Sequence, residues 1–180
     1  SLPRPLLDGT NTSNTLADVA AYYYETDLRL TGSSYCTSST GGDLCTNNVP
    51  VGGVDQATHQ HMTTFTLGLG VSGYMLFDEN YRTATNGDFF DVANGTPANP
   101  TNGVCTWQTS GACNWPIPVN NSPPNVDDLW HAAVNGRGTY FTARDPASLY
   151  TGLARALAAI NDRRGAAAAA TTSNPNISAG

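Results

Sequence analysis

Lysine is absent from this sequence of 180 residues, and all eight basic residues are arginines. Only 12% of the residues are charged, and the formal net charge is −6. A surface that binds nucleic acid needs clustered basic side chains to replace phosphate counterions, so this composition argues against a nucleic-acid partner. Because no run of about 18 apolar residues occurs, we expect no membrane span. An initiating Met and a signal peptide are missing as well, which predicts a piece of a longer precursor.

The sequence also lacks the short motifs that carry common catalytic chemistry. It has no G-x-S-x-G nucleophile elbow, and its GLGVSG segment matches neither of the usual phosphate-binding glycine patterns. We therefore expect no catalytic residue, no enzymatic activity and no cofactor within these residues. His59 and His61 could present two metal ligands on one face of a strand, but no third ligand is marked nearby. The alternative is that both histidines cap the entry to the strand.

The four cysteines form two local pairs, and each pair lies in a stretch rich in Gly, Ser, Thr and Asn. Cys36 pairs with Cys45, and Cys105 pairs with Cys113, in the favoured interpretation of two loop disulfides. Each disulfide would contribute roughly 2–4 kcal/mol to stability. A structural zinc site is the alternative, although neither pair has the short C-x₂₋₄-C spacing typical of one. Disulfides indicate an oxidising compartment, either the periplasm or the cell surface.

The most regular pattern lies in the last third of the chain. Apolar residues at helical spacing predict a short helix over 126–135 with a glycine stop. A compact run of strand formers follows over 138–143. A second helix is predicted to begin at Pro146, after an aspartate N-cap, and to end at Gly165. Its predicted apolar face consists of Leu149, Leu153, Leu157 and Ile160.

Two further elements are predicted upstream. Thr15 and Asp18 form a capping box that starts the first helix. The predicted buried stripe of this helix consists of Leu16, Val19, Ala20 and Tyr23. Residues 62–71 carry no charge and are expected to form a parallel strand covered by helices on both faces. The long segment 72–125 is then an insertion at the edge of the sheet, with a short helix within 78–91.

The sequence DDLWHAAVNGRGTYFTA, followed by a helix that begins DP-x-x-L, resembles part of a known family. It resembles the end of the von Willebrand factor type A-like domain in the PilY/PilC family of type IV pilus tip-associated proteins. Segments 14–29 and 61–73 are similar to that family's preceding helix and strand. The resemblance implies an α/β, Rossmann-like sheet with helices on both faces. Residues 1–165 would be its C-terminal part, with 72–125 as a disulfide-stapled insertion, and residues 166–180 would be a linker toward a following domain.

Type A domains often hold a divalent cation through a D-x-S-x-S loop, because hard oxygen ligands suit Mg²⁺ and Ca²⁺. No such loop occurs in this sequence. The resemblance begins after the metal-bearing strands of the family, so it implies that any divalent cation site lies upstream in the parent protein.

Function is expected to rest on recognition by surface side chains. Trp107 and Trp115 are candidate anchors for a partner, and Tyr22 and Tyr24 are further candidates. Packing within the protein's own core is the alternative for these aromatic residues. The resemblance implies pilus assembly and surface adhesion at the pilus tip, after secretion to the periplasm and cell surface. Partners would be minor pilins, other pilus components, host or abiotic surfaces, and other parts of the precursor. We expect strand 62–71 to be completed by other parts of the precursor or by a partner. A secreted glycan- or surface-binding module is the alternative.

Overall fold

The computed structural model describes residues 3–9 and 12–172, and it describes side chains up to residue 162 within the last helix. The chain folds into four α-helices, one 3₁₀ helix and two strands in this part of the sequence. In chain order they are α1 (Leu16–Glu25), β1 (Thr64–Leu69), α2 (Asp88–Asn94), η1 (Pro100–Asn102), α3 (Pro124–Asn135), β2 (Arg137–Ala143) and α4 (Pro146–Thr172). None of the described helices combines the length and the apolar character needed to cross a membrane.

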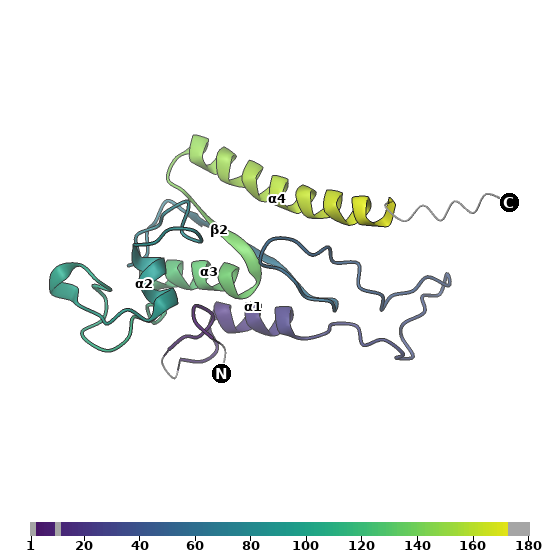
Figure 1. Ribbon diagram of the computed structural model, residues 1–180, viewed down its shortest axis with the longest axis horizontal. Coiled ribbons are helices and arrows are strands. Elements are labelled where there is room, and N and C mark those ends of the chain that lie inside the picture. The colour runs from purple at the N-terminus through teal and green to yellow at the C-terminus, as the bar shows by residue number, and fades with distance from the viewer. Residues whose placement is uncertain (1–2, 10–11, 173–180) are drawn as a thin grey trace.

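The two strands pair in parallel, with Leu67 opposite Phe141. Helix α4 packs on one face of this sheet and α3 on the other, while α1 packs on α3 as an outer layer (Figure 1). Gly138 allows the strands to meet, because a Cβ atom there would lie 2.0 Å from the carbonyl oxygen of Thr64. The arrangement is that of an α/β fold with helices on both faces, as the sequence predicted. The finer type A-like topology stays a prediction.

Helix α1 has the predicted capping box, in which the Thr15 and Asp18 side chains each bond the other residue's backbone N–H. The predicted buried stripe was wrong. Ala17, Ala20 and Tyr24 are buried, whereas three of the four predicted residues (Leu16, Val19 and Tyr23) are exposed. The helix is apolar nearly all round, so contacts with α3 decide its rotation. The Asp128 carboxylate accepts the N–H groups of Leu16 and Ala17, and the small alanines let the two helices approach closely.

The insertion 72–125 contributes much of the core. Trp130, on α3, is 2% exposed and lies at the centre of an aromatic cluster drawn from three regions of the chain. The rings within 6 Å of the Trp130 ring belong to Phe77, Tyr81, Phe89, Trp115 and Tyr140. The insertion is therefore packed against α3 and β2 rather than attached as a free loop. Its short helix, α2, lies only partly within the predicted 78–91 range.

Helix α4 differs from the prediction in two ways. It does not end at Gly165 but continues to Thr172, because the run of alanines that follows has high helix propensity and offsets the cost of one glycine, about 1 kcal/mol. Its sheet-facing side is centred on the buried Gly152, which approaches Leu67 and Phe141. Three residues of the predicted apolar face are exposed instead: Leu153, Leu157 and Ile160. Residues 173–180 of the predicted linker lie outside the described part of the chain.

Candidate protein-binding groove

Both predicted disulfides are present, Cys36–Cys45 and Cys105–Cys113. The second closes a compact loop that its own side chains hold rigid. The Gln108 amide nitrogen donates to the carbonyl oxygens of Ser110 and Ala112, both at 2.7 Å, and its Oε1 accepts the backbone N–H of Asn114. These bonds fix the loop before any partner is present.

The lead-in segment, residues 3–9, holds this loop against the rest of the insertion. The Arg4 guanidinium donates to the carbonyl oxygens of Val92 and Cys113 and to Asn114 Oδ1. The indole N–H of Trp115 donates to the carbonyl oxygen of Pro5 at 2.7 Å. Nothing in the local sequence of this segment indicates a partner 110 residues away.

Beside this braced loop lies a groove of about 440 Å³ without any charged residue in its wall. Tyr74 is 49% exposed, and Ile117 and Val119 are also exposed. The lining residues are Tyr74, Trp107, Gln108, Ser110, Asn114, Trp115, Pro116, Ile117, Val119, Ser122 and Pro124. Aromatic and aliphatic side chains with a few amide and hydroxyl groups give this groove the character of a recognition site.

The four predicted recognition residues do not form one site. Trp107 is half-buried and lines the groove, and its indole N–H donates to Asn114 O at 2.9 Å. Trp115 is only 4% exposed and stacks on the His131 ring at 4.4 Å. Tyr24 is 6% exposed, and its hydroxyl donates to Asp55, whereas Tyr22 is 60% exposed. Trp115 and Tyr24 are therefore buried, and Trp115 packs in the core cluster as well as lining the groove. A recognition role for these residues stays a prediction.

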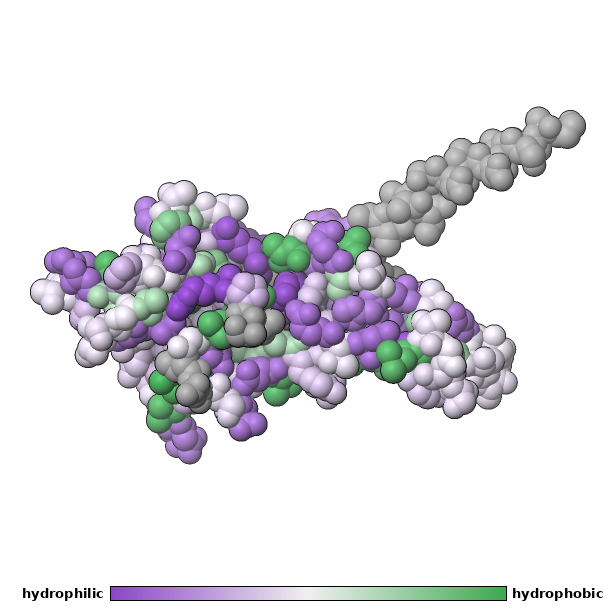
Figure 2. Space-filling view, turned by 60° about the horizontal axis from the view of Figure 1, so that its bottom comes forward, coloured by the Kyte–Doolittle hydropathy of each residue, from purple (hydrophilic) through white to green (hydrophobic). Residues whose placement is uncertain are grey.

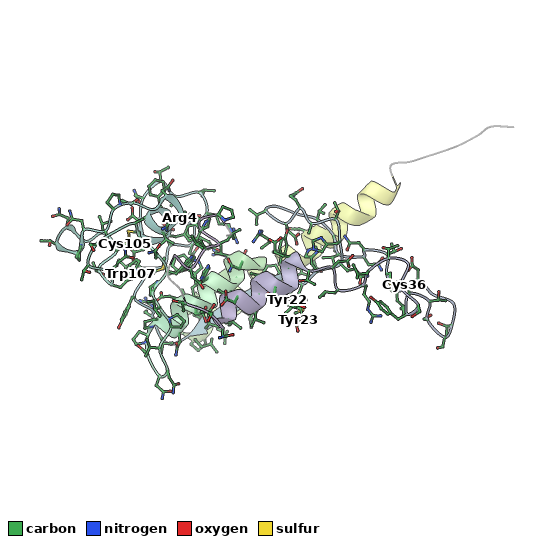
Figure 3. The ribbon with its side chains drawn as sticks, turned by 90° about the horizontal axis from the view of Figure 1, so that it is seen from below. Arg4, Tyr22, Tyr23, Cys36, Cys105 and Trp107 are labelled. Carbon is green, nitrogen blue, oxygen red and sulfur yellow. A yellow bond between two sulfur atoms is a disulfide. The ribbon has the colours of Figure 1, made fainter. Side chains whose placement is uncertain are left out.

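Tyr22 and Trp107 lie on different parts of the molecule. Figure 3 shows Trp107 and Cys105 in the insertion, with Arg4 of the lead-in segment close by, and Tyr22 with Tyr23 on α1. On the face that carries α1, hydrophobic residues form separate patches among hydrophilic ones (Figure 2). The groove is the candidate site that contains a predicted recognition residue with a partly exposed ring, Trp107, whereas Tyr74, Ile117 and Val119 were not predicted to line it. In the sequence, Ile117 and Val119 are marked only by apolar character within a proline-rich stretch, and Tyr74 lies in a separate segment at the start of the insertion.

The two histidines considered as metal ligands have protein partners. His61 Nε2 lies 3.0 Å from an Asp55 carboxylate oxygen, and both side chains are fully buried. His61 Nδ1 lies 2.7 Å from the carbonyl oxygen of His59, and His59 Nε2 lies 2.9 Å from the carbonyl oxygen of Tyr24. The Thr63 hydroxyl also donates to the Asp55 carboxylate, at 2.8 Å. The described residues contain no group of three or more His, Cys, Asp or Glu placed to hold a metal ion.

Buried ionisable groups lie behind the groove. The Asp127 carboxylate accepts the backbone N–H groups of Tyr74 and Met75 at 2.8 and 3.1 Å, which anchors the start of the insertion. Burial raises the pKa of Asp127 to about 6. Burial also raises the pKa of Asp8 to about 6, with further contributions from nearby carboxylates. Burial lowers the pKa of His131 to about 4.

Replacing Asp8 with Asn should stabilise the protein at pH 7.5 by about 1 kcal/mol, a value discounted for partial solvent screening. The ordinary pKa of Asp8 is 3.8, and its pKa in the folded protein is about 6. The ionised carboxylate is therefore less stable in the folded protein than in the unfolded chain, and this destabilisation is fully present above pH 6. It disappears as the pH falls from 6 toward 3.8. The advantage of Asp8→Asn should therefore shrink between pH 7.5 and pH 4.5. Urea unfolding of both proteins across this range measures it.

A matched control comes from an aspartate with the opposite shift. Hydrogen bonds from Thr46 and Cys45 hold the pKa of Asp43 below its ordinary value. Its ionised form therefore favours folding above the ordinary pKa, and Asp43→Asn should not stabilise the protein at pH 7.5. His131 Nδ1 lies 3.2 Å from Asp8 Oδ1, so His131 is a direct neighbour of the substituted group. The pKa of folded His131 is about 4, so His131 stays mostly neutral down to pH 4.5 and Asp8 dominates the difference between the proteins. An Asp8→Asn advantage that did not vary with pH would contradict the assignment.

The chain is similar over most of its length to proteins of one kind. It is 31% identical over 167 residues to the type IV pilus biogenesis factor PilY1 of Pseudomonas aeruginosa strain UCBPP-PA14, which covers 89% of this chain and 13% of that protein. It is 32% identical to PilY1 of strain PAK over 152 residues (76% of this chain and 11% of that protein). It is also 32% identical to PilY1 of strain PAO1 over 160 residues (81% and 11%).

Other comparisons add no further relationship. No protein-family model matches the chain, and no solved structure gives a significant match. The chain spans only a small part of the curated relatives that it matches. Within that span, the chain is a PilY1-related sequence, as the resemblance to the PilY/PilC family predicted.

Proposed function

We propose that this chain acts in type IV pilus biogenesis and surface adhesion as a non-enzymatic recognition module at the pilus tip. Relationship to proteins named type IV pilus biogenesis factors supports the process. The observation that supports recognition as the mode of action is the uncharged groove, lined by aromatic residues, on the insertion. Its partner would be a minor pilin or another pilus component that offers an apolar, uncharged segment. The module needs no cofactor of its own, and any divalent cation site lies upstream in the parent protein.

The state of the polar groups in the groove favours a protein partner over a sugar. The Gln108 amide and the Trp107 indole N–H are already used within the loop. A glycan site needs free planar polar groups beside its aromatic rings to bond the sugar hydroxyls. Here the exposed rim consists mainly of Tyr74, Ile117 and Val119, which suits apolar contact. A glycan- or surface-binding module is the second candidate, and the binding experiment below distinguishes it from a protein-binding module.

The two disulfides support a location outside the cytoplasm. Both disulfides close loops, and no free cysteine is found among the described residues. Disulfides of this kind persist in the periplasm and on the cell surface. We place the protein there and at the pilus tip, where host or abiotic surfaces would be additional partners.

Replacing Tyr74 with Ala should weaken binding to a reconstituted minor-pilin complex by roughly tenfold or more, because Tyr74 is the exposed aromatic ring of the groove. The backbone N–H of Tyr74 still bonds Asp127 in this variant, so the fold is retained. Biolayer interferometry with the immobilised complex measures the dissociation constant.

Tyr22→Ala is the matched control, since Tyr22 is exposed to a similar degree but lies on α1. It should change the dissociation constant by less than about twofold. Equal losses for both variants, or no saturable binding by the wild-type chain, would refute the groove as the pilin contact. Saturable binding of an oligosaccharide that Tyr74→Ala abolishes would favour the glycan module instead.

A further inference from the structure

A second cavity lies between helix α4 and the outer edge of β2, and it shares no lining residue with the groove. Its volume is about 340 Å³. Helix α4 passes over β2 (Figure 1), and these two elements supply two of its walls. Phe77 and Glu79, from the first part of the insertion, supply a third. Three regions of the chain thus meet around this space.

Part of the cavity wall is apolar. A Cβ atom placed on Gly152 would lie 3.5 Å from the Cβ of Phe141, so the Phe141 side chain faces α4. Phe77 packs edge-on against the Tyr140 ring at 5.3 Å. Both phenylalanines line the cavity and are half-buried. Their rings can therefore contact an apolar group of a ligand.

The edge of β2 adds backbone groups to the wall. The N–H of Gly70 donates to the carbonyl oxygen of Ala143, so Ala143 bonds β1. Alternate residues of a paired strand face its partner, so the backbone groups of Tyr140 and Thr142 point away from β1. The Tyr81 hydroxyl accepts the N–H of Tyr140, whereas no described residue accepts the N–H of Thr142. The Thr142 N–H is therefore available to a ligand.

An ion pair joins the two sides of the cavity. Arg155 on α4 lies 2.7 Å from Glu79, and their side chains are 54% and 64% exposed. Neither side chain bonds any other described residue. An exposed ion pair contributes little to stability, so both groups can turn to a ligand at low cost.

The hydroxyl groups on the α4 wall are already used. Ser148 Oγ accepts the N–H groups of Arg144 and Asp145 and donates to the carbonyl oxygen of Asp145. Thr151 Oγ1 donates to the carbonyl oxygen of Ala147. The charged pair therefore dominates the polar character of the cavity, which disfavours a sugar. A ligand with a single charge would leave one member of the pair without a partner, whereas a ligand with both charges would satisfy the two.

We propose that this cavity binds a free amino acid with an apolar side chain, such as leucine. Its carboxylate bonds Arg155 and the N–H of Thr142, and its ammonium group bonds Glu79. Its side chain lies against Phe77 and Phe141. Two ligand bonds thus replace the single ion pair, and the volume is at the small end of ligand sites, as suits a molecule of this size. The inference does not depend on the groove or its partner.

Titration of the 180-residue chain with L-leucine, followed by NMR, tests the proposal. The Thr142 amide should shift saturably with a dissociation constant of about 1 mM or lower, and the Trp107 indole in the groove should not shift. Leucine amide lacks the carboxylate and N-acetyl-leucine lacks the ammonium group, so each should bind at least about tenfold more weakly. The absence of a saturable Thr142 shift would overturn the proposal. A derivative that binds as tightly as leucine would also overturn it and would assign the cavity to one end of a peptide.

Two variants assign the ligand charges to their partners. In Glu79→Gln the ammonium group has no anionic partner, so leucine and N-acetyl-leucine should bind equally. In Arg155→Gln, leucine and leucine amide should bind equally for the corresponding reason. Glu25→Gln is the matched control, because Glu25 is 50% exposed and pairs with Arg137 outside this cavity. It should leave leucine binding unchanged. A preference for leucine that survives in both cavity variants, or an equal loss in the control, would contradict the assignment.

Discussion

Replacing Trp130 with Ala should lower the free energy of unfolding by about 3–5 kcal/mol and leave little folded protein at 37 °C. The Trp130 ring is the only one in the described chain that touches rings from the first part of the insertion, its last part and β2 together. It stacks on Phe89 at 5.7 Å and on Tyr140 at 5.5 Å. Its removal would leave a large cavity where these segments meet, and chemical denaturation followed by circular dichroism measures the loss.

Trp130→Phe is the informative control. Among the described residues, the Trp130 indole N–H is buried without a hydrogen-bond acceptor, which costs stability. Phenylalanine removes that N–H and keeps an aromatic ring against the same neighbours. The small cavity left by the substitution destabilises the protein, whereas removal of the unpaired N–H stabilises it. These two effects should largely cancel, so the free energy of unfolding should change by less than about 1.5 kcal/mol. A loss for Phe as large as that for Ala would show that the indole is needed for more than packing.

Removing the second disulfide, through Cys105→Ser with Cys113→Ser, should cost about 2–5 kcal/mol. Both cysteines are completely buried within the aromatic core cluster, so the substitution also places two hydroxyl groups among apolar neighbours. The loop that carries Trp107 should then lose its order. The ligand-free protein would show this as faster hydrogen exchange over 104–114, measured alongside thermal unfolding.

The first disulfide provides the comparison. Cys36 and Cys45 close a loop of nearly the same length, with a separation of 9 residues against 8. Chain entropy alone therefore predicts similar costs for the two pairs. The loop around Cys36 lies at the opposite end of the molecule from Trp107 (Figure 3), outside the aromatic core. The double serine variant there should be the milder of the two. Equal destabilisation would show that burial in the core adds nothing.

Local pattern predicted the elements better than it predicted their orientation. The helix after residue 123, β2 and β1 were all expected near their observed positions, because each has strong periodicity or strand propensity and clear end signals. The predicted rotation of α1 was wrong because Leu16 and Ala17 are both apolar. Contacts with α3, more than 100 residues away in the sequence, decide which of them faces inward. The rotation of α4 was wrong for a related reason. Small residues such as Gly152 pack on the sheet and leave the leucines outside.

The candidate site was predicted only in part. Trp107 was identified because tryptophan in a long loop is unusual enough to single out. Tyr74 was not identified, because the groove exists only where the start of the insertion meets residues 107–124. Trp115 could not be assigned to the core from its neighbours in sequence, since Pro5 and His131 are what cover it. In each case the role of the residue depends on contacts between distant parts of the chain, which the local sequence does not reveal.

The Arg4 clamp has a consequence for how the protein matures. The two disulfides join cysteines 9 and 8 residues apart, so oxidation can proceed while most of the chain is still unfolded. Arg4 instead meets partners 88 to 110 residues downstream. Residues 3–9 can therefore dock only after the insertion has folded. Oxidation state alone is consequently a poor marker of maturity, because a fully cross-linked chain can still lack its groove.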